Sequence, residues 1–310
     1  MQEKEEKLTQ KVKKSVGRPR KHQPRLPKPK NGIVTKPSEP FHVIEFLYDK
    51  PIIFKKIWQF FKLMAVDKIQ INFSKDAIYM WCHDHHKKSY MRVKIDCNEV
   101  NHYYAQEELE IGLLCKNPEL VMNTIDKTCN SITFVSTNDS LQKNIQIVLK
   151  NDIEFEEIHK IDLIGDYNRV EDDSKFLDED YAIKFKLPGK YFKKIISDIR
   201  TFSDQATIRQ DGMEEPLMFE FIKHDKKIKS LHMAKNSKSI SLVSKIKEDE
   251  TFRTSFKVDY IKPISSAVLA DNIEIYADEN KPLMFIIQMD NNAIEMKILT
   301  DIIDNRDTEI

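Results

Sequence analysis

A repeated segment constrains the fold of this chain more than any other feature of its sequence. Phe-Lys-Lys-Ile occurs at residues 54–57 and again 138 positions later, at residues 192–195. A strand pattern that begins at Ile132 recurs 141 positions later at Ile273, and helical and strand patterns follow in the same order around both copies. A match of four identical residues could occur by chance. The shared order of helical and strand patterns around both copies favours a duplication. We therefore expect two similar domains.

The first forty residues differ in composition from the rest. Residues 1–40 hold twelve Lys or Arg and four Glu, whereas the whole chain holds 50 basic and 50 acidic residues, so the remainder is acidic. Such a tail is too poor in apolar residues to offset the entropy of ordering, and we expect it to be disordered. The predicted organisation is a basic tail at 1–40, domain 1 at 41–156, an acidic interdomain connector at 157–180, domain 2 at 181–304 and a C-terminal tail at 305–310.

The basic tail contains a short motif, Val-Gly-Arg-Pro-Arg-Lys at residues 16–21, that is similar to the core of an AT-hook. In such a hook, the extended Gly-Arg-Pro backbone lays arginine into the narrow minor groove of A·T-rich DNA. Arg18 and Arg20 are then the predicted DNA-binding residues of the tail. A plain basic tail that contacts phosphates without reading sequence explains the same residues. Both interpretations place a polyanion near the tail.

The sequence after the tail favours antiparallel strands. Apolar and polar residues alternate in five segments, at residues 69–73, 145–149, 183–187, 217–221 and 294–298. This period of two is typical of strands with one buried face. Only six glycines are present, and none forms a phosphate-binding loop or a GxGxxG turn. We predict an α+β protein built on antiparallel sheets, and not a doubly wound nucleotide-binding enzyme.

Two segments have the pattern of amphipathic helices with basic polar faces. Residues 51–64 and 190–202 each place apolar residues at helical spacing and lysines between them. Weaker helical patterns lie at residues 118–128 and 258–269, and Pro263 has to fall near the first turn of the latter. The four helices form two pairs, one pair in each predicted domain.

The order of these elements resembles the eukaryotic-type sliding clamps over about residues 41–303. Residues 53–63 look like the first channel-facing helix of that family, residues 185–199 like the start of its second domain, and residues 162–165 like the start of its connector. Residues 51–55 and 101–105, with the Gly-Arg-Pro tail, look closer still to the clamp-like protein of African swine fever virus and related giant viruses. The resemblance implies the DNA clamp fold, with two antiparallel sheets and two helices per domain, assembled as a homotrimeric ring.

A positive inner wall is required if an acidic ring is to surround DNA. Flexible lysines on the helices would attract phosphates without fixing a register, so that the ring slides. Any surface helix can show a lysine face, but two matched basic faces in an otherwise acidic body favour the channel. Besides Arg18 and Arg20, the predicted DNA-binding residues are Lys55, Lys56, Lys62, Lys127, Lys193, Lys194, Arg200 and Lys262.

The resemblance also implies two protein interfaces. Clients of the family dock with short motifs in a pocket beneath the connector, near the 81–86 loop here. The family's usual proline after the pocket is missing, so client preference stays open. The predicted client-binding residues are Asp162, Leu163, Ile164, Leu269, Ile298 and Leu299. Ring closure pairs uncapped edge strands near 153–161 and 228–233. The predicted subunit-interface residues are Ile153, Phe155, Ile158, Ile228, Leu231 and Met233.

Other chemistry has weak support in the sequence. Residues 81–86 contain metal-ligand residue types, but adjacent side chains diverge, and a polar loop is the simpler interpretation. Asp211, Glu220 and Lys223 suggest a nuclease arrangement, yet strand alternation places Glu220 and Lys223 on opposite faces. We therefore expect no catalytic residues, no metal and no cofactor.

The functional prediction is a non-enzymatic DNA sliding clamp, or processivity factor, which encircles double-stranded DNA and tethers DNA polymerase and other replication or repair proteins. We expect no membrane association, because no apolar run approaches the roughly 20 residues that span a bilayer. A viral protein of this kind would lie inside the cell, at cytoplasmic replication sites or in the nucleus. Two alternatives remain open, namely a clamp-fold viral late transcription factor and a DNA-binding regulator that acts through the tail.

Overall fold

The computed structural model describes residues 32–303, apart from 141–142, 153–154, 166–175, 178, 224–225, 234–236 and 268, and it describes only the backbone of 222–223 and 226–233. Arg18 and Arg20 of the predicted DNA-binding tail therefore lie outside the described residues, as does Ile153 of the predicted subunit interface. Ile228, Leu231 and Met233 are placed on their strand by the backbone alone.

The first half of the chain forms nine strands, two α-helices and a short 3-10 helix. In chain order the elements are β1 (His42–Tyr48), α1 (Pro51–Leu63), β2 (Lys68–Phe73), β3 (Ala77–His83), β4 (Ser89–Asp96), η1 (Cys97–Glu99), β5 (His102–Ala105), β6 (Leu109–Leu114), α2 (Lys116–Thr124), β7 (Cys129–Thr137), β8 (Asn144–Asn151) and β9 (Glu156–Asp162).

The second half repeats this order without the 3-10 helix. Its elements are β10 (Ile183–Pro188), α3 (Gly189–Phe202), β11 (Gln205–Asp211), β12 (Leu217–Lys223), β13 (Lys226–Met233), β14 (Ser241–Ser244), β15 (Thr251–Lys257), α4 (Val258–Ala267), β16 (Asn272–Ala277), β17 (Leu283–Met289) and β18 (Ile294–Thr300).

The two halves pair their strands by one scheme, and every pair is antiparallel. Strand β1 lies between β5 and β7, as β10 lies between β14 and β16. Strand β2 lies between β3 and β6, as β11 lies between β12 and β15. Each half then ends in a three-strand run, β7-β8-β9 or β16-β17-β18. The repeated pairing supports the duplication that the sequence predicts.

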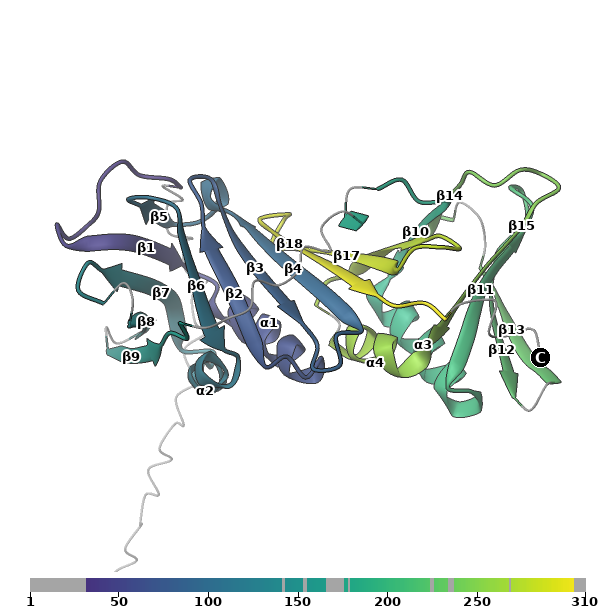
Figure 1. Ribbon diagram of the computed structural model, residues 1–310, viewed down its shortest axis with the longest axis horizontal. Coiled ribbons are helices and arrows are strands. Elements are labelled where there is room, and N and C mark those ends of the chain that lie inside the picture. The colour runs from purple at the N-terminus through teal and green to yellow at the C-terminus, as the bar shows by residue number, and fades with distance from the viewer. Residues whose placement is uncertain are drawn as a thin grey trace, which may run out of the picture.

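One strand pair joins the two halves within the chain. The last strand of the second half, β18, pairs with β4 of the first half over seven residue pairs, from Ile294 with Ile95 to Thr300 with Ser89. The join produces one nine-stranded sheet with the order β14-β10-β16-β17-β18-β4-β3-β2-β6. A five-stranded sheet, β5-β1-β7-β8-β9, and a four-stranded sheet, β13-β12-β11-β15, complete the halves. The molecule is elongated, with the halves side by side (Figure 1).

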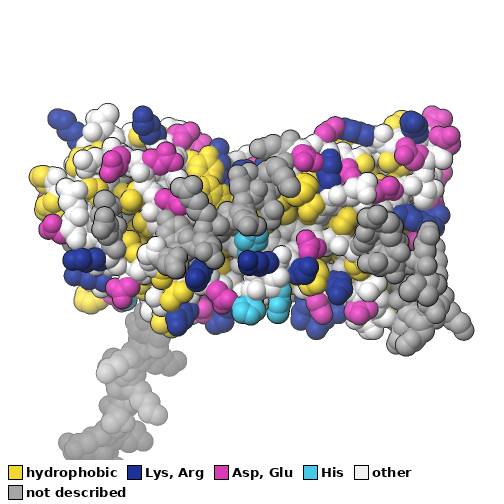
Figure 2. Space-filling model, viewed as in Figure 1, with side chains coloured by type: hydrophobic (Ala, Val, Ile, Leu, Met, Phe, Trp, Pro, Cys, Tyr) yellow, Lys and Arg dark blue, Asp and Glu magenta, His cyan; other side chains and the backbone are white. Residues whose placement is uncertain are grey.

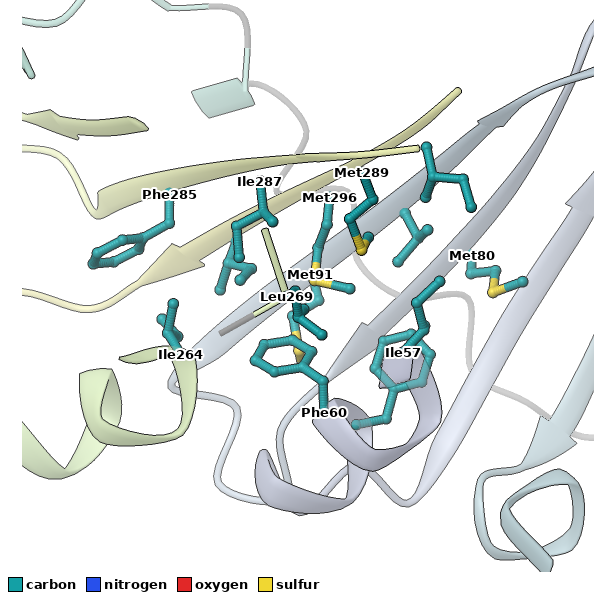
Figure 3. Packing of buried hydrophobic residues seen from close by; sticks show 14 of the residues in the cluster. Ile57, Phe60, Met80, Met91, Ile264, Leu269, Phe285, Ile287, Met289 and Met296 are labelled. Atoms are coloured by element: carbon teal, nitrogen blue, oxygen red, sulfur yellow. The ribbon is translucent and has the colours of Figure 1, made fainter. Parts of the chain in front are cut away.

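The four helices lie in a row along one edge of the molecule, the lower edge in Figure 1. Helix α1 begins at Pro51, whose fixed φ and missing N–H suit the first helical turn. Its apolar residues face the sheets. Where the halves meet, Phe60 of α1 and Leu269 pack toward Met91 and Met296 of the joined strands (Figure 3). Burial of these side chains fixes the helices against the sheet. Among the described residues, no helix is both long and apolar enough to cross a membrane.

The alternation of apolar residues predicted the strands, and the helix limits were less accurate. Residues 145–149, 183–187, 217–221 and 294–298 lie in strands whose alternate side chains are buried, while β2 is buried on both faces. Helices α2 and α4 end earlier than predicted, at Thr124 and Ala267. Pro263 is the sixth residue of α4, past the first turn, so the prediction that it falls near that turn is wrong.

Part of the predicted disordered tail is ordered. Within residues 32–40, Ile33 forms a parallel bridge with Tyr103 of β5, and the Ser38 amide donates a 2.9 Å hydrogen bond to Glu45 of β1. The bridge and the backbone hydrogen bonds between residues 32–34 and Tyr103 cover part of the free edge of β5. Composition alone missed these bonds because they join backbone groups, which any sequence supplies.

The predicted start of the connector at residue 157 is also wrong. Residues 156–162 form β9, which pairs with β8 along its whole length. The sequence Glu-Glu-Ile-His-Lys-Ile-Asp conceals this strand, because most of its side chains are exposed at the end of the five-stranded sheet. The connecting segment therefore begins after Asp162.

Candidate nucleic-acid interface

Helix α1 presents three lysines on the side away from the sheets, and two of them have partners on or near α2. Lys62 Nζ lies 2.6 Å from Glu119 Oε1. Lys55 Nζ donates to the Ile125 carbonyl at 2.6 Å and to the Asn123 carbonyl at 3.1 Å, at the C-terminal end of α2. Cations are favoured there because the last carbonyls of a helix have no intrahelical partner. Both ammonium groups are therefore held against α2.

The third lysine of α1 lies at the boundary between the halves. Lys56 is exposed and lines a groove of about 530 Å³ between α1 and the loop that precedes β16. The wall of the groove also holds Asp271, Glu274 and Asp290. Two of these carboxylates already have cationic partners, because Glu274 pairs with Lys184 and Lys186 and Asp290 pairs with Lys50.

Helix α3 presents four cations, all of them exposed. They are Lys190, Lys193, Lys194 and Arg200. Within the described part of the chain, none of these four makes an ion pair or a side-chain hydrogen bond. The buried face of the helix consists of Phe192, Ile195, Ile196 and Ile199, so the basic residues are directed away from the core.

The row of helices carries a net positive charge. Its four helices hold nine Lys or Arg and three acidic residues, although the whole chain has no net charge. Basic side chains lie along the lower edge in Figure 2, among acidic ones. Of the less central predictions, Lys127 is exposed in the turn after α2, and Lys262 is half-buried on α4. All eight predicted cations outside the tail thus lie on or beside the helices.

Two strand edges on opposite ends of the molecule lack a second neighbour among the described residues. Strand β9 pairs only with β8, and β13 pairs only with β12. Phe155 and Ile158, two predicted interface residues at the β9 edge, are more than half exposed. Apolar side chains on an open strand edge are a site for pairing with another chain.

A small apolar cluster lies on the face of the nine-stranded sheet that the helices do not cover. Tyr90, Met284, Ile286 and Leu299 form it with Leu177 and Tyr181 from the end of the connecting segment. Lys297 Nζ holds that segment by a 3.1 Å hydrogen bond to the Leu177 carbonyl. Beside the cluster is a cavity of about 100 Å³ whose lining combines apolar residues with charged and polar ones; it includes Tyr90, Phe176, Pro282, Leu299, His83, Lys87, Lys88 and Asp301.

The predicted client-binding residues do not lie together. Leu299 borders the cavity, but Ile298 is fully buried toward the helices and Leu269 is buried at the junction between the halves, so neither can contact a client. Alternation along β18 gives the reason, because successive side chains point to opposite faces. Asp162, Leu163 and Ile164 lie near β6, which β2, β3 and β4 separate from β18.

The other predicted residue clusters have structural partners. In the 81–86 segment, His85 Nδ1 lies 2.6 Å from Asp67, and that hydrogen bond raises the pKa of His85. No three His, Cys, Asp or Glu side chains of the described residues are placed to hold a metal. Asp211 and Glu220 both contact Arg209, at 2.7 Å and 3.3 Å. An arginine between two carboxylates neutralises them, which suits a structural ion pair.

The strand order, the helix row and the junction between the halves define the class to which the fold belongs. No protein-family model matches the chain. Its structure is similar to PCNA from Thermococcus kodakaraensis, with a TM-score of 0.71 and 15% identity over 84% of this chain and 100% of the other. PCNA from Entamoeba histolytica gives a TM-score of 0.70 and 13% identity over 84% and 99%. The chain has the α+β fold of the PCNA clamps, which confirms the fold prediction.

The sequence has a viral relative that it matches over nearly the whole of both chains. The chain is 29% identical over 289 residues to an uncharacterized protein of African swine fever virus, which covers 91% of this chain and 96% of the relative. The predicted resemblance to that virus's protein is therefore confirmed. The match includes residues from both halves of this chain.

Proposed function

We propose that this protein is a DNA sliding clamp, a closed ring of identical chains that encircles duplex DNA and tethers DNA polymerase and other replication or repair proteins. The function depends on topology and requires no catalytic group. A tethered partner stays at high effective concentration on its template, and processivity increases for that reason.

The junction between the halves is the observation that carries the proposal. By the shared pairing scheme, β9 is the counterpart of β18 and β13 is the counterpart of β4. Strands β18 and β4 pair within the chain, whereas β9 and β13 have open edges in the described structure. A neighbouring copy can repeat the same antiparallel join by placing its β13 against β9. Such head-to-tail contacts form a ring when the rotation closes.

The sequences of the two open strands suit this pairing. Strand β9 carries Glu156 and Glu157, whereas β13 carries Lys226, Lys227 and Lys229. Opposite charges on adjacent strands favour pairing and disfavour the pairing of each strand with its own copy. The family that the sequence resembles implies a ring of three chains, which contains six halves. We therefore propose a homotrimer.

The basic helix row then supplies the inner wall of the ring. Phosphates of the duplex would meet flexible lysine and arginine side chains, and these contacts carry no sequence information. The cavity beside Leu299 is the proposed client site, because apolar residues line part of it and the apolar cluster with Leu177 and Tyr181 lies next to it. We place this activity inside the cell, at viral replication sites or in the nucleus.

Electron microscopy of the purified protein provides the first test. We expect class averages with a central hole wide enough for duplex DNA and a mass of three chains by light scattering. A monomer at micromolar concentration, or a particle without a hole, would refute the ring.

Retention on DNA tests the topological mechanism. After incubation with nicked circular plasmid, the protein should co-elute with the circle and be released when a restriction enzyme linearises it. A variant that lacks residues 1–31 serves as the control, because a regulator that binds through its tail would lose all DNA binding. Equal retention on linear and circular DNA would contradict encirclement.

A further inference from the structure

The duplication places the same three basic positions on the two long helices. At the offset of the repeated Phe-Lys-Lys-Ile segment, Lys55, Lys56 and Lys62 of α1 correspond to Lys193, Lys194 and Arg200 of α3. From sequence alone, the two halves therefore offer DNA equivalent positive faces. Their surroundings in the structure differ.

Two of the three cations of α1 already have partners in the protein. Lys62 is paired with Glu119, and Lys55 donates to two carbonyls at the end of α2. Lys56 lines the groove that also contains Asp271, Glu274 and Asp290. A lysine that contacts a phosphate must first give up its protein partner, and the exchange reduces the net gain from each contact.

The burial pattern identifies what replaces Glu119 in the second half. The same spacing of buried residues runs through the short helices of both halves, at Cys115, Pro118, Val121 and Met122 and at Val258, Ile261, Ile264 and Ser265. This alignment places Lys262 at the position of Glu119. Where the first half has a carboxylate beside Lys62, the alignment gives the second half a cation, Lys262, at the position corresponding to that carboxylate.

We infer that the contact of the proposed clamp with DNA is unequal within each chain, and that α3 and α4 of the second half carry most of the phosphate contacts. This inference rests on the proposed function. The contacting groups are Lys193, Lys194, Arg200, Lys190 and Lys262. Lys190 was not among the residues that the sequence singled out, although it lies in the same helix and is exposed.

Matched neutral variants of the full-length protein test the inequality. One variant carries Lys193→Gln, Lys194→Gln and Arg200→Gln, and the other carries Lys55→Gln, Lys56→Gln and Lys62→Gln. Binding to a fluorescent 30-base-pair duplex is measured between 50 and 200 mM NaCl. The tail contributes equally to the salt dependence of every variant. A difference between variants in the slope of log affinity against log salt concentration therefore reports the number of helix–phosphate contacts, at about 0.9 per phosphate.

The α3 variant should lose at least about tenfold in affinity at the lowest salt, with a shallower slope, whereas the α1 variant should lose less than about threefold. Light scattering confirms that both variants keep the mass of the unmodified protein. Equal losses, or a larger loss in the α1 variant, would overturn the inference while leaving the clamp intact. If the unmodified protein binds neither this duplex nor a plasmid circle, the proposed function itself fails.

Two single substitutions at the aligned positions give opposite expectations. Glu119→Gln releases Lys62 and should raise affinity for the duplex about two- to threefold. Lys262→Glu installs a carboxylate at the position corresponding to Glu119 and should lower affinity by a larger factor. A decrease with Glu119→Gln, in a protein of unchanged thermal stability, would show that the ion pair does not restrain Lys62.

Discussion

The strand edges that the chain closes for itself differ from those that it leaves open. Backbone hydrogen bonds from residues 32–34 cover β5, Ile164 bonds to the edge of β6 at 2.9 Å, and Ile303 bonds to β15 at 2.8 Å. Strands β4 and β18 close each other. Among the described residues, β9, β13 and β14 keep one open edge each.

The difference teaches where a partner is expected. An open edge presents unpaired N–H and C=O groups, so proteins cover such edges unless another chain does so. Two of the three open edges are the counterparts of the strands that join the halves. The third, β14, has no such counterpart in a joined pair and is only four residues long. It provides a control for every experiment on the other two.

The largest expected effect comes from breaking the closed junction. Ile298→Ala removes a fully buried side chain from β18 and should lower the free energy of unfolding by about 3 kcal/mol. Urea denaturation measures the change. Val243→Ala on the open β14 edge, where the side chain is 56% exposed, should cost less than about 0.5 kcal/mol. Similar costs at both sites would mean that the closed junction is not tightly packed.

A smaller effect is expected at an open edge, and only on assembly. Ile158, 59% exposed on β9, would face the lysine-rich β13 of a neighbour. Ile158→Lys places like charges together and should weaken each contact about tenfold, or about 1.4 kcal/mol. Light scattering over a dilution series should show that the variant dissociates at a higher protein concentration than the unmodified protein. Val243→Lys should leave the mass unchanged, and a matching loss in that control would show that β9 has no special role.

The smallest effect concerns the closed edge of β5. Burial raises the pKa of Glu45, but hydrogen bonds from Ser38, His42 and His102 outweigh it and lower that pKa from 4.5 to about 2. The folded-state pKa is depressed, so the stabilisation is present above about pH 4.5 and is lost as pH falls toward 2.

Replacing that carboxylate tests its contribution. Glu45→Gln should lower the free energy of unfolding by about 1 kcal/mol at pH 7. The difference from the unmodified protein should shrink as the pH falls from 4.5 to 2, measured by urea denaturation at each pH. A difference that does not change with pH would show that charge at Glu45 does not hold residues 32–40 in place.

The fold could be predicted largely because its signals are local. The alternation in β8, β10, β12 and β18 and the helical spacing in α1 and α3 each depend on which side chains face the core. Strand β9 lacks such a local pattern, because charged residues fill its exposed edge. The alternation of apolar residues therefore did not show that β9 belongs to the five-stranded sheet along its whole length. Residues 32–34 were missed because their contacts use the backbone.

The site was predictable in part. The lysines of α1 and α3 were identified from sequence, but the pairing of Lys62 with Glu119 joins residues 57 positions apart and has no local signature. The error at Ile298 was avoidable. The pattern that buries Ile294, Met296 and Ile298 together also directs Leu299 to the opposite face, where it borders the cavity.

The turn between β17 and β18 fastens the two halves at a second place. Tyr48 donates a hydrogen bond to Asp290, and Lys50 forms an ion pair with the same carboxylate. Burial, together with Asp290, raises the pKa of Tyr48, which therefore remains a donor at neutral pH. Together with the β4–β18 ladder, this contact fastens the two halves of each chain at two places. If three such chains enclose DNA, the duplex has to enter through a gap between neighbouring chains, since bending within one chain would break both attachments.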